Sequence, residues 1–174
     1  MRIELASFAQ VEQEWESADR RRGDGNTIGL LLRLQGEPFT WWRVQADWID
    51  LSRVIALPSN KREGQVNQWE RLSGGSYQFE DIAKRVLSGA EAPKIISYAE
   101  QPVTWTTRPV CVTDSIDAAG ATVICIDGCN RLAAAHVRRR RGEEQALPEL
   151  IVGEGPGASP TRLNELYGFE LTST

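Results

Sequence analysis

The sequence predicts an α+β domain in which helices pack a small mixed sheet and the N-terminus adds a β-rich extension. The first observation is the order of the segments. Short apolar stretches are followed by a helix pair, a hairpin, another helix and a last strand. The second is size and composition: 174 residues suffice for one domain with a real core, and 41% hydrophobic with 25% charged residues is typical of a folded chain.

Residues 1–46 are expected to form the extension and to pack on the core. Two apolar stretches, residues 28–32 and 39–44, are separated by Gly36 and flanked by polar residues, a pattern typical of strands joined by turns. A further strand is predicted over residues 48–57, because this run ends at a proline.

Two helices are predicted next. Residues 65–72 carry Val66, Trp69 and Leu72 three positions apart, and two glycines follow as a stop. Residues 79–87 form the clearest amphipathic helix of the chain, since their apolar side chains recur on one face and a glycine follows shortly after.

The second half of the core begins with a predicted hairpin. Residues 108–113 and 121–126 are rich in β-branched residues and flank the turn-like stretch 114–120. An alanine-rich helix is expected over residues 130–141, and a last strand over residues 147–152.

The chain is thereby divided into three parts. The extension is followed by a core domain over residues 47–152. Residues 153–174 are expected to form a loop rich in glycine, proline and serine, and then a short helix that begins near Ser159 and Pro160.

Composition argues against several classes of protein. The net charge of -4 argues against stable duplex DNA binding, because nonspecific affinity comes from basic side chains, and the run Arg138 to Arg141 is expected to be a solvated helix end. Three cysteines without a Cys-x-x-Cys pair argue against a disulfide framework or a zinc site and fit a reducing compartment. With no apolar run of about 20 residues and no signal-peptide pattern, we expect a cytoplasmic protein with no membrane partner.

The segment Asp127-Gly128-Cys129-Asn130-Arg131 links the second hairpin strand to the alanine-rich helix. A strand that passes directly into a helix exposes unpaired backbone N–H groups where the helix dipole favours negative charge. Gly128 tolerates positive φ, and Arg131 adds a forked cationic donor suited to phosphate. The sequence therefore predicts an anion site, most simply for nucleotide phosphates. The alternative is structural: Asp127 caps the helix and Arg131 pairs with a surface carboxylate.

Residues 47–152 resemble the ParB/sulfiredoxin superfamily, and three motifs carry the resemblance. The family has a strand, then Asp-Gly-His-His-Arg or Gly-Gly-Cys-His-Arg, then an alanine-containing helix and an Ile-Pro-x-x-Val strand. Here the same order reads Pro109-Val110-Cys111-Val112, then Ile124-Cys125-Ile126-Asp127-Gly128-Cys129-Asn130-Arg131-Leu132-Ala133-Ala134-Ala135, then Leu147-Pro148-Glu149-Leu150-Ile151-Val152.

The free serine kinase branch of that family implies transfer of phosphate from ATP or ADP to a small molecule, with Mg²⁺ as cofactor. By this resemblance Asp127, Gly128 and Arg131 match the phosphate-binding turn, in which Cys129 replaces the motif histidine and Asn130 follows it. Asp127 would bind Mg²⁺ or orient the acceptor hydroxyl.

The same branch implies a glutamate near the first helix as the base. Glu63 is the best-placed candidate, and its alternative role is a charge at a helix N-terminus. Lys61 or Arg62 would neutralise charge that develops on the phosphates.

Two other functions stay open at this point. A sulfiredoxin-like reductase would use Cys129, whose place at a helix N-terminus beside Arg131 predicts a lowered thiol pKa. A non-enzymatic module would sense a nucleotide, CTP included, or associate with DNA. The only histidine, His136, lies inside the helix and is expected to face solvent or to pack. The sequence leaves the oligomeric state open.

Overall fold

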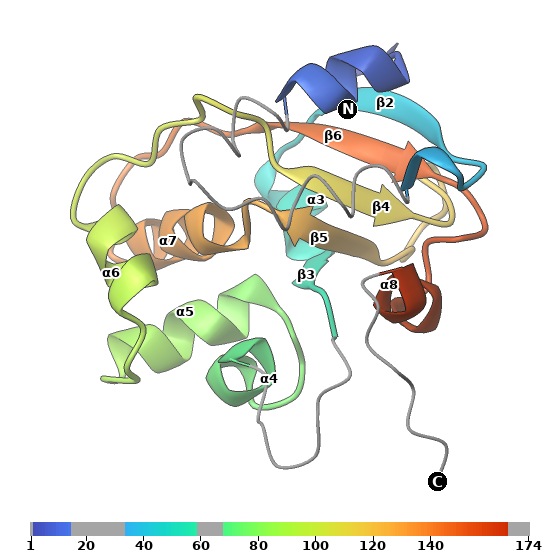
Figure 1. The fold of residues 1–174 in the computed structure, drawn as a ribbon. Coiled ribbons are helices and arrows are strands. Elements are labelled where there is room, and N and C mark those ends of the chain that lie inside the picture. The colour runs from blue at the N-terminus through green and yellow to red at the C-terminus, as the bar shows by residue number, and fades with distance from the viewer. Residues whose placement is uncertain (1, 15–33, 59–67, 167–174) are drawn as a thin grey trace, which may run out of the picture.

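The computed structural model describes residues 2–14, 34–58 and 68–166, and within them helices cover both faces of one six-stranded mixed sheet (Figure 1). The predicted α+β class is confirmed. The strands are β1 (Arg2–Leu5), β2 (Thr40–Gln45), β3 (Val54–Ala56), β4 (Val110–Thr113), β5 (Val123–Asp127) and β6 (Glu149–Glu154). The helices are α3 (Trp48–Ser52), α4 (Gln68–Ser73), α5 (Phe79–Leu87), α6 (Pro93–Ala99), α7 (Cys129–Arg140) and α8 (Pro160–Leu166), and residues 8–14 are also helical.

The strand order is β1-β2-β6-β4-β5-β3. β4 lies in the middle, antiparallel to β5 and parallel to β6, and the register pairs Cys111 with Cys125 and Val110 with Ile151. The two strands before residue 47 join the same sheet, because β2 pairs antiparallel with β6 along its whole length. The β4–β5 pairing places the residues before Val110 beside the end of β5, and that neighbourhood holds the predicted anion site.

Hydrophobic cores fill both sides of the sheet. Along β5 the side chains alternate, so Cys125 packs among the helices α5, α6 and α7 while Ile124 packs on the opposite face. The second face is covered by residues 8–14 and by α8, through Val11 and Leu163 among others. β5 is thus buried on both faces, which gives the turn at its end a rigid base.

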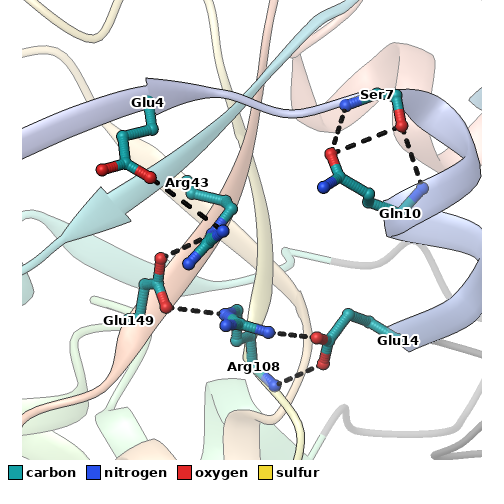
Figure 2. A network of polar contacts seen from close by, with 7 residues as sticks. All are labelled: Glu4, Ser7, Gln10, Glu14, Arg43, Arg108 and Glu149. Carbon is teal, nitrogen blue, oxygen red and sulfur yellow. Dashed lines mark hydrogen bonds and ion pairs between the residues drawn. The ribbon is translucent and has the colours of Figure 1, made fainter.

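A network of ion pairs ties the N-terminal residues to the sheet (Figure 2). The Arg43 Nε donates to Glu149 Oε1 at 2.7 Å, and the Arg108 Nε donates to Glu149 Oε2 at 2.8 Å. Arg108 also pairs with Glu14, the last described residue of the N-terminal helix, and Glu4 lies 4.0 Å from Arg43. Burial alone would raise the pKa of Glu149, but hydrogen bonds from both arginines outweigh it and lower this pKa.

Several predicted elements agree with the structure. The helix predicted over residues 79–87 has the predicted bounds, and the hairpin, the alanine-rich helix and the last strand lie within two residues of their predicted starts. The short terminal helix begins at Pro160, after Ser159 whose Oγ accepts from the Arg162 amide at 3.1 Å. The strand predicted at 28–32 lies outside the described residues.

The prediction of one strand over residues 48–57 is wrong in its first half. Asp47 accepts from the Asp50 amide at 2.8 Å and Asp50 accepts from the Asp47 amide at 3.1 Å, a capping box that starts α3. Only β3 remains as a strand. β1, the helix at residues 8–14 and α6 were not predicted, and α6 begins with a proline at its first position, where proline is tolerated. Among the described residues, no helix combines the length and apolar character needed to cross a membrane.

Candidate anion-binding site

The turn between β5 and α7 brings the predicted site residues together. β5 ends at Asp127, and α7 begins at Cys129 with Gly128 as the N-cap residue in the left-handed conformation, at φ 92°. The N-cap residue of α7 is a glycine, so it has no side chain that could cap the helix. The Gly128 carbonyl accepts from the amides of Arg131 and Leu132, which closes the first turn of the helix.

Gly128 lies against Pro109, the residue that precedes β4. A Cβ at this position would lie 3.0 Å from the Pro109 Cβ and 3.1 Å from the Pro109 Cα. Real Cβ atoms rarely approach other atoms this closely, and L residues rarely adopt a φ near 92°. Both the conformation and the contact therefore require glycine here.

The Arg131 side chain is almost buried, with 12% of it exposed. Its Nη1 donates to the Thr107 carbonyl, and its Nη2 lies 3.8 Å from the Asp127 carboxylate, which is 5% exposed. The guanidinium carbon also lies 5.8 Å from the centre of the Trp105 ring. The predicted pairing with a surface carboxylate is therefore wrong, because the carboxylate is buried and lies in the turn itself.

Three residues support the turn: Trp105 and Thr107, which the sequence did not single out, and Pro109, which opens one of the quoted motifs but was given no role at the turn. They precede β4, and only the antiparallel pairing of β4 with β5 places them beside the turn. The available signal was the hairpin itself. A strand antiparallel to β5 must begin where β5 ends.

Cys129 is half-buried at the first position of α7, with its Sγ 3.4 Å from the Cys125 carbonyl oxygen. The hydrogen bond with the Cys125 thiol, followed by burial and the nearby Asp127, raises the pKa of Cys129 well above its usual value. The predicted lowering of this pKa is wrong. The sequence showed the helix N-terminus and Arg131 but not the second thiol that faces Cys129.

Asn130 occupies the second position of α7 and is partly exposed. The first turn of α7 carries no acidic residue. The other predicted site residues, Lys61, Arg62 and Glu63, lie outside the described residues. Among the described residues, no group of three or more histidine, cysteine or acidic side chains is arranged to hold a metal ion.

The arginine run at the end of α7 is explained by intramolecular contacts. Arg138 donates to the Ala99 carbonyl at 3.1 Å and pairs with Glu143, as Arg141 also does. Arg140 pairs with Glu80, and Arg139 lies over the Trp48 ring. Arg139, Arg140 and Arg141 remain exposed, which agrees with the predicted solvated helix end.

His136 is buried on α7, with 2% of its surface exposed. It packs against Trp48 and Phe79, its Nδ1 lies 3.4 Å from Glu80, and its Nε2 has no partner among the described residues. Burial lowers the pKa of His136 below 6.5, against the opposing effect of Glu80. The expectation of packing is met, and the imidazole is neutral in the core.

We expect the free energy of unfolding to fall as the pH drops below about 6.5. In the unfolded chain this histidine binds a proton there, whereas folded His136 binds one only at lower pH. The slope is at most about 1.4 kcal/mol per pH unit. His136→Leu should flatten the profile measured by urea unfolding between pH 7 and pH 5, since the chain has no other histidine. Glu80→Gln should steepen it, and equal slopes in all three proteins would contradict the prediction.

Comparison of the chain with protein-family models, curated proteins and solved structures found no match. The resemblance to the ParB/sulfiredoxin superfamily therefore stays a prediction that rests on the motifs quoted above.

Proposed function

We propose that the turn from Asp127 to Arg131 binds the phosphates of a nucleotide, and that the protein transfers phosphate from ATP or ADP to a small molecule. The supporting observation is the start of α7, a helix of 12 residues whose N-cap residue is Gly128 and whose first turn holds Arg131. Elsewhere in the chain α3 begins with a complete capping box. A helix start with a glycine N-cap beside an arginine is a common phosphate-binding arrangement.

Each residue of the turn has a place in this proposal. The first amides of α7 and the Arg131 guanidinium would hold phosphate oxygens, and Gly128 would let the ligand approach the backbone. Asp127 would orient the acceptor hydroxyl. Phosphoryl transfer depends mostly on such positioning and on charge stabilisation. Lys61, Arg62 and Glu63 keep their predicted roles as charge-neutralising residues and base.

Mg²⁺ fits this site only together with a nucleotide. The described residues offer one carboxylate at the turn, Asp127, and no cluster of three ligands. Proteins commonly hold Mg²⁺ with one or two carboxylates plus the phosphates of the substrate. When bound, the ion would neutralise charge on those phosphates.

The alternatives have less support. A thiol-dependent reductase needs a reactive thiolate, and the pKa of Cys129 is raised. A DNA-associated module is disfavoured by the net charge of -4, and each arginine from Arg138 to Arg141 also contacts a group of the same chain.

The proposal predicts that ATP, ADP or CTP with Mg²⁺ raises the melting temperature. A ligand at ten times its Kd stabilises the folded state by about 1.4 kcal/mol, which corresponds to about 3–6 °C for a chain of this size. Asn130→Asp should abolish the shift without lowering the melting temperature of the free protein. An acidic residue in the first turn stabilises a helix but repels a phosphate.

Lys94→Gln is the matched control, because Lys94 is exposed on α6 and this variant changes the net charge by the same amount. It should keep the full shift. No shift with any nucleotide at millimolar concentration would refute the anion site, and an unchanged shift in Asn130→Asp would place the ligand elsewhere. Binding without release of ADP or AMP in the presence of hydroxyl acceptors would refute phosphate transfer alone.

A further inference from the structure

All three cysteines of the chain meet where β4, β5 and α7 come together. Cys111 and Cys125 are opposite each other in the antiparallel β4–β5 pair. The Cys129 Sγ lies 3.4 Å from the Cys125 carbonyl oxygen, and the Cys125 Sγ donates to the Asp127 carbonyl at 3.0 Å. Both sulfur atoms therefore lie inside the bend that leads from β5 into α7.

We propose that Cys125 and Cys129 are a peroxide-oxidisable pair that closes to a disulfide at the start of α7. Their exposure assigns the two roles. Cys129 is partly exposed, whereas Cys111 and Cys125 are both 0% exposed. A small peroxide therefore meets Cys129 first, and Cys125 is the thiol that resolves the product. This proposal does not depend on nucleotide binding.

The chemistry balances with hydrogen peroxide as the oxidant. The Cys129 thiolate attacks one peroxide oxygen, the O–O bond breaks, and Cys129 becomes a sulfenic acid while water leaves. The Cys125 thiolate then attacks the Cys129 sulfur, the S–O bond breaks, and the S–S bond forms as a second water leaves. Two thiols lose two electrons and two protons, and one peroxide becomes two waters.

The surroundings of the two cysteines determine how fast they are oxidised and how well the disulfide resists reduction. Contact with the Cys125 thiol and burial raise the pKa of Cys129, and burial is the main cause that raises the pKa of Cys125. The thiolate fraction at neutral pH is therefore small, so oxidation is slow and should accelerate about tenfold per pH unit between pH 7 and pH 9. A thiol of high pKa is also a poor leaving group, so the disulfide should resist reduction once formed.

The closed bond would change the turn itself. The disulfide removes both thiol protons and with them the hydrogen bonds from Cys129 to the Cys125 carbonyl and from Cys125 to the Asp127 carbonyl. Oxidation should therefore alter the backbone at the start of α7.

The test is oxidation of the full chain with excess hydrogen peroxide, followed by blocking of free thiols and mass spectrometry under non-reducing conditions. Cleavage before Asp114 and Asp127 places the three cysteines on separate peptides. The expected product has lost two hydrogen atoms and joins the Cys125 and Cys129 peptides. Cys111→Ala, the matched control, should give the same product, whereas Cys125→Ala should leave Cys129 to be oxidised further.

Three results would overturn the proposal. They are a bond between Cys111 and Cys125, a sulfinic acid on Cys129 with Cys125 still a free thiol, and a rate of oxidation that does not change with pH. The wild-type chain alone answers each of these, so the result does not depend on whether a variant folds.

Discussion

Gly128→Ala is expected to destabilise the protein by about 2–5 kcal/mol. A left-handed backbone costs an L residue about 1–2 kcal/mol, and forcing a methyl group into a packed site costs a further 1–3 kcal/mol or so. Both penalties apply, because Gly128 has a φ of 92° and its added Cβ would lie 3.0 Å from the Pro109 Cβ. Urea unfolding measures the loss as a lower midpoint at constant slope.

Gly89→Ala is the matched control for this prediction. Gly89 has a φ of 94°, but a Cβ there would meet nothing within 4 Å. It should therefore cost only the backbone strain, about 1–2 kcal/mol. The difference between the two variants isolates the contact with Pro109. Equal losses would mean that the segment before β4 moves aside at no cost, and that it does not hold the turn in place.

The sequence predicted the elements whose signals are local. α5 was predicted with its full bounds because its apolar side chains recur on one face within nine residues and a glycine follows shortly after. α3 was missed because Trp48 to Leu57 is apolar enough for a strand, and the deciding signal was a pair of aspartates, Asp47 and Asp50. α6 was not predicted, although a proline at the first position is compatible with a helix.

The turn between β5 and α7 was predicted in its position, but its surroundings were not. The strand, the glycine and Arg131 are neighbours in sequence, so their arrangement follows from the turn. The partners of Arg131 do not follow from it, because Thr107 and Trp105 come from more than twenty residues earlier. The pKa of Cys129 was predicted in the wrong direction for the same reason. The helix N-terminus is a local feature, whereas the facing Cys125 thiol depends on how the chain bends.

Arg131→Met is expected to lower the free energy of unfolding by about 3 kcal/mol or more. Breaking a buried ion pair by removing one partner is typically this costly, because the remaining charge loses its compensation. Here the remaining charge is Asp127, which is 5% exposed and lies 3.8 Å from the guanidinium. The variant also loses the hydrogen bond to the Thr107 carbonyl. Arg131→Lys should recover only part of the loss, since an ammonium group cannot reproduce the forked geometry.

The double variant Asp127→Asn with Arg131→Met separates folding from binding. Because the neutral amide no longer needs the arginine, this variant should be more stable than Arg131→Met alone, with a coupling energy of about 1–3 kcal/mol in the double-mutant cycle. It should nevertheless show no nucleotide-dependent rise in melting temperature, since it lacks the cation that would hold the phosphates. Additive losses would mean that the two side chains do not stabilise each other. A nucleotide shift equal to that of the wild type would assign the binding to the amides of α7 alone.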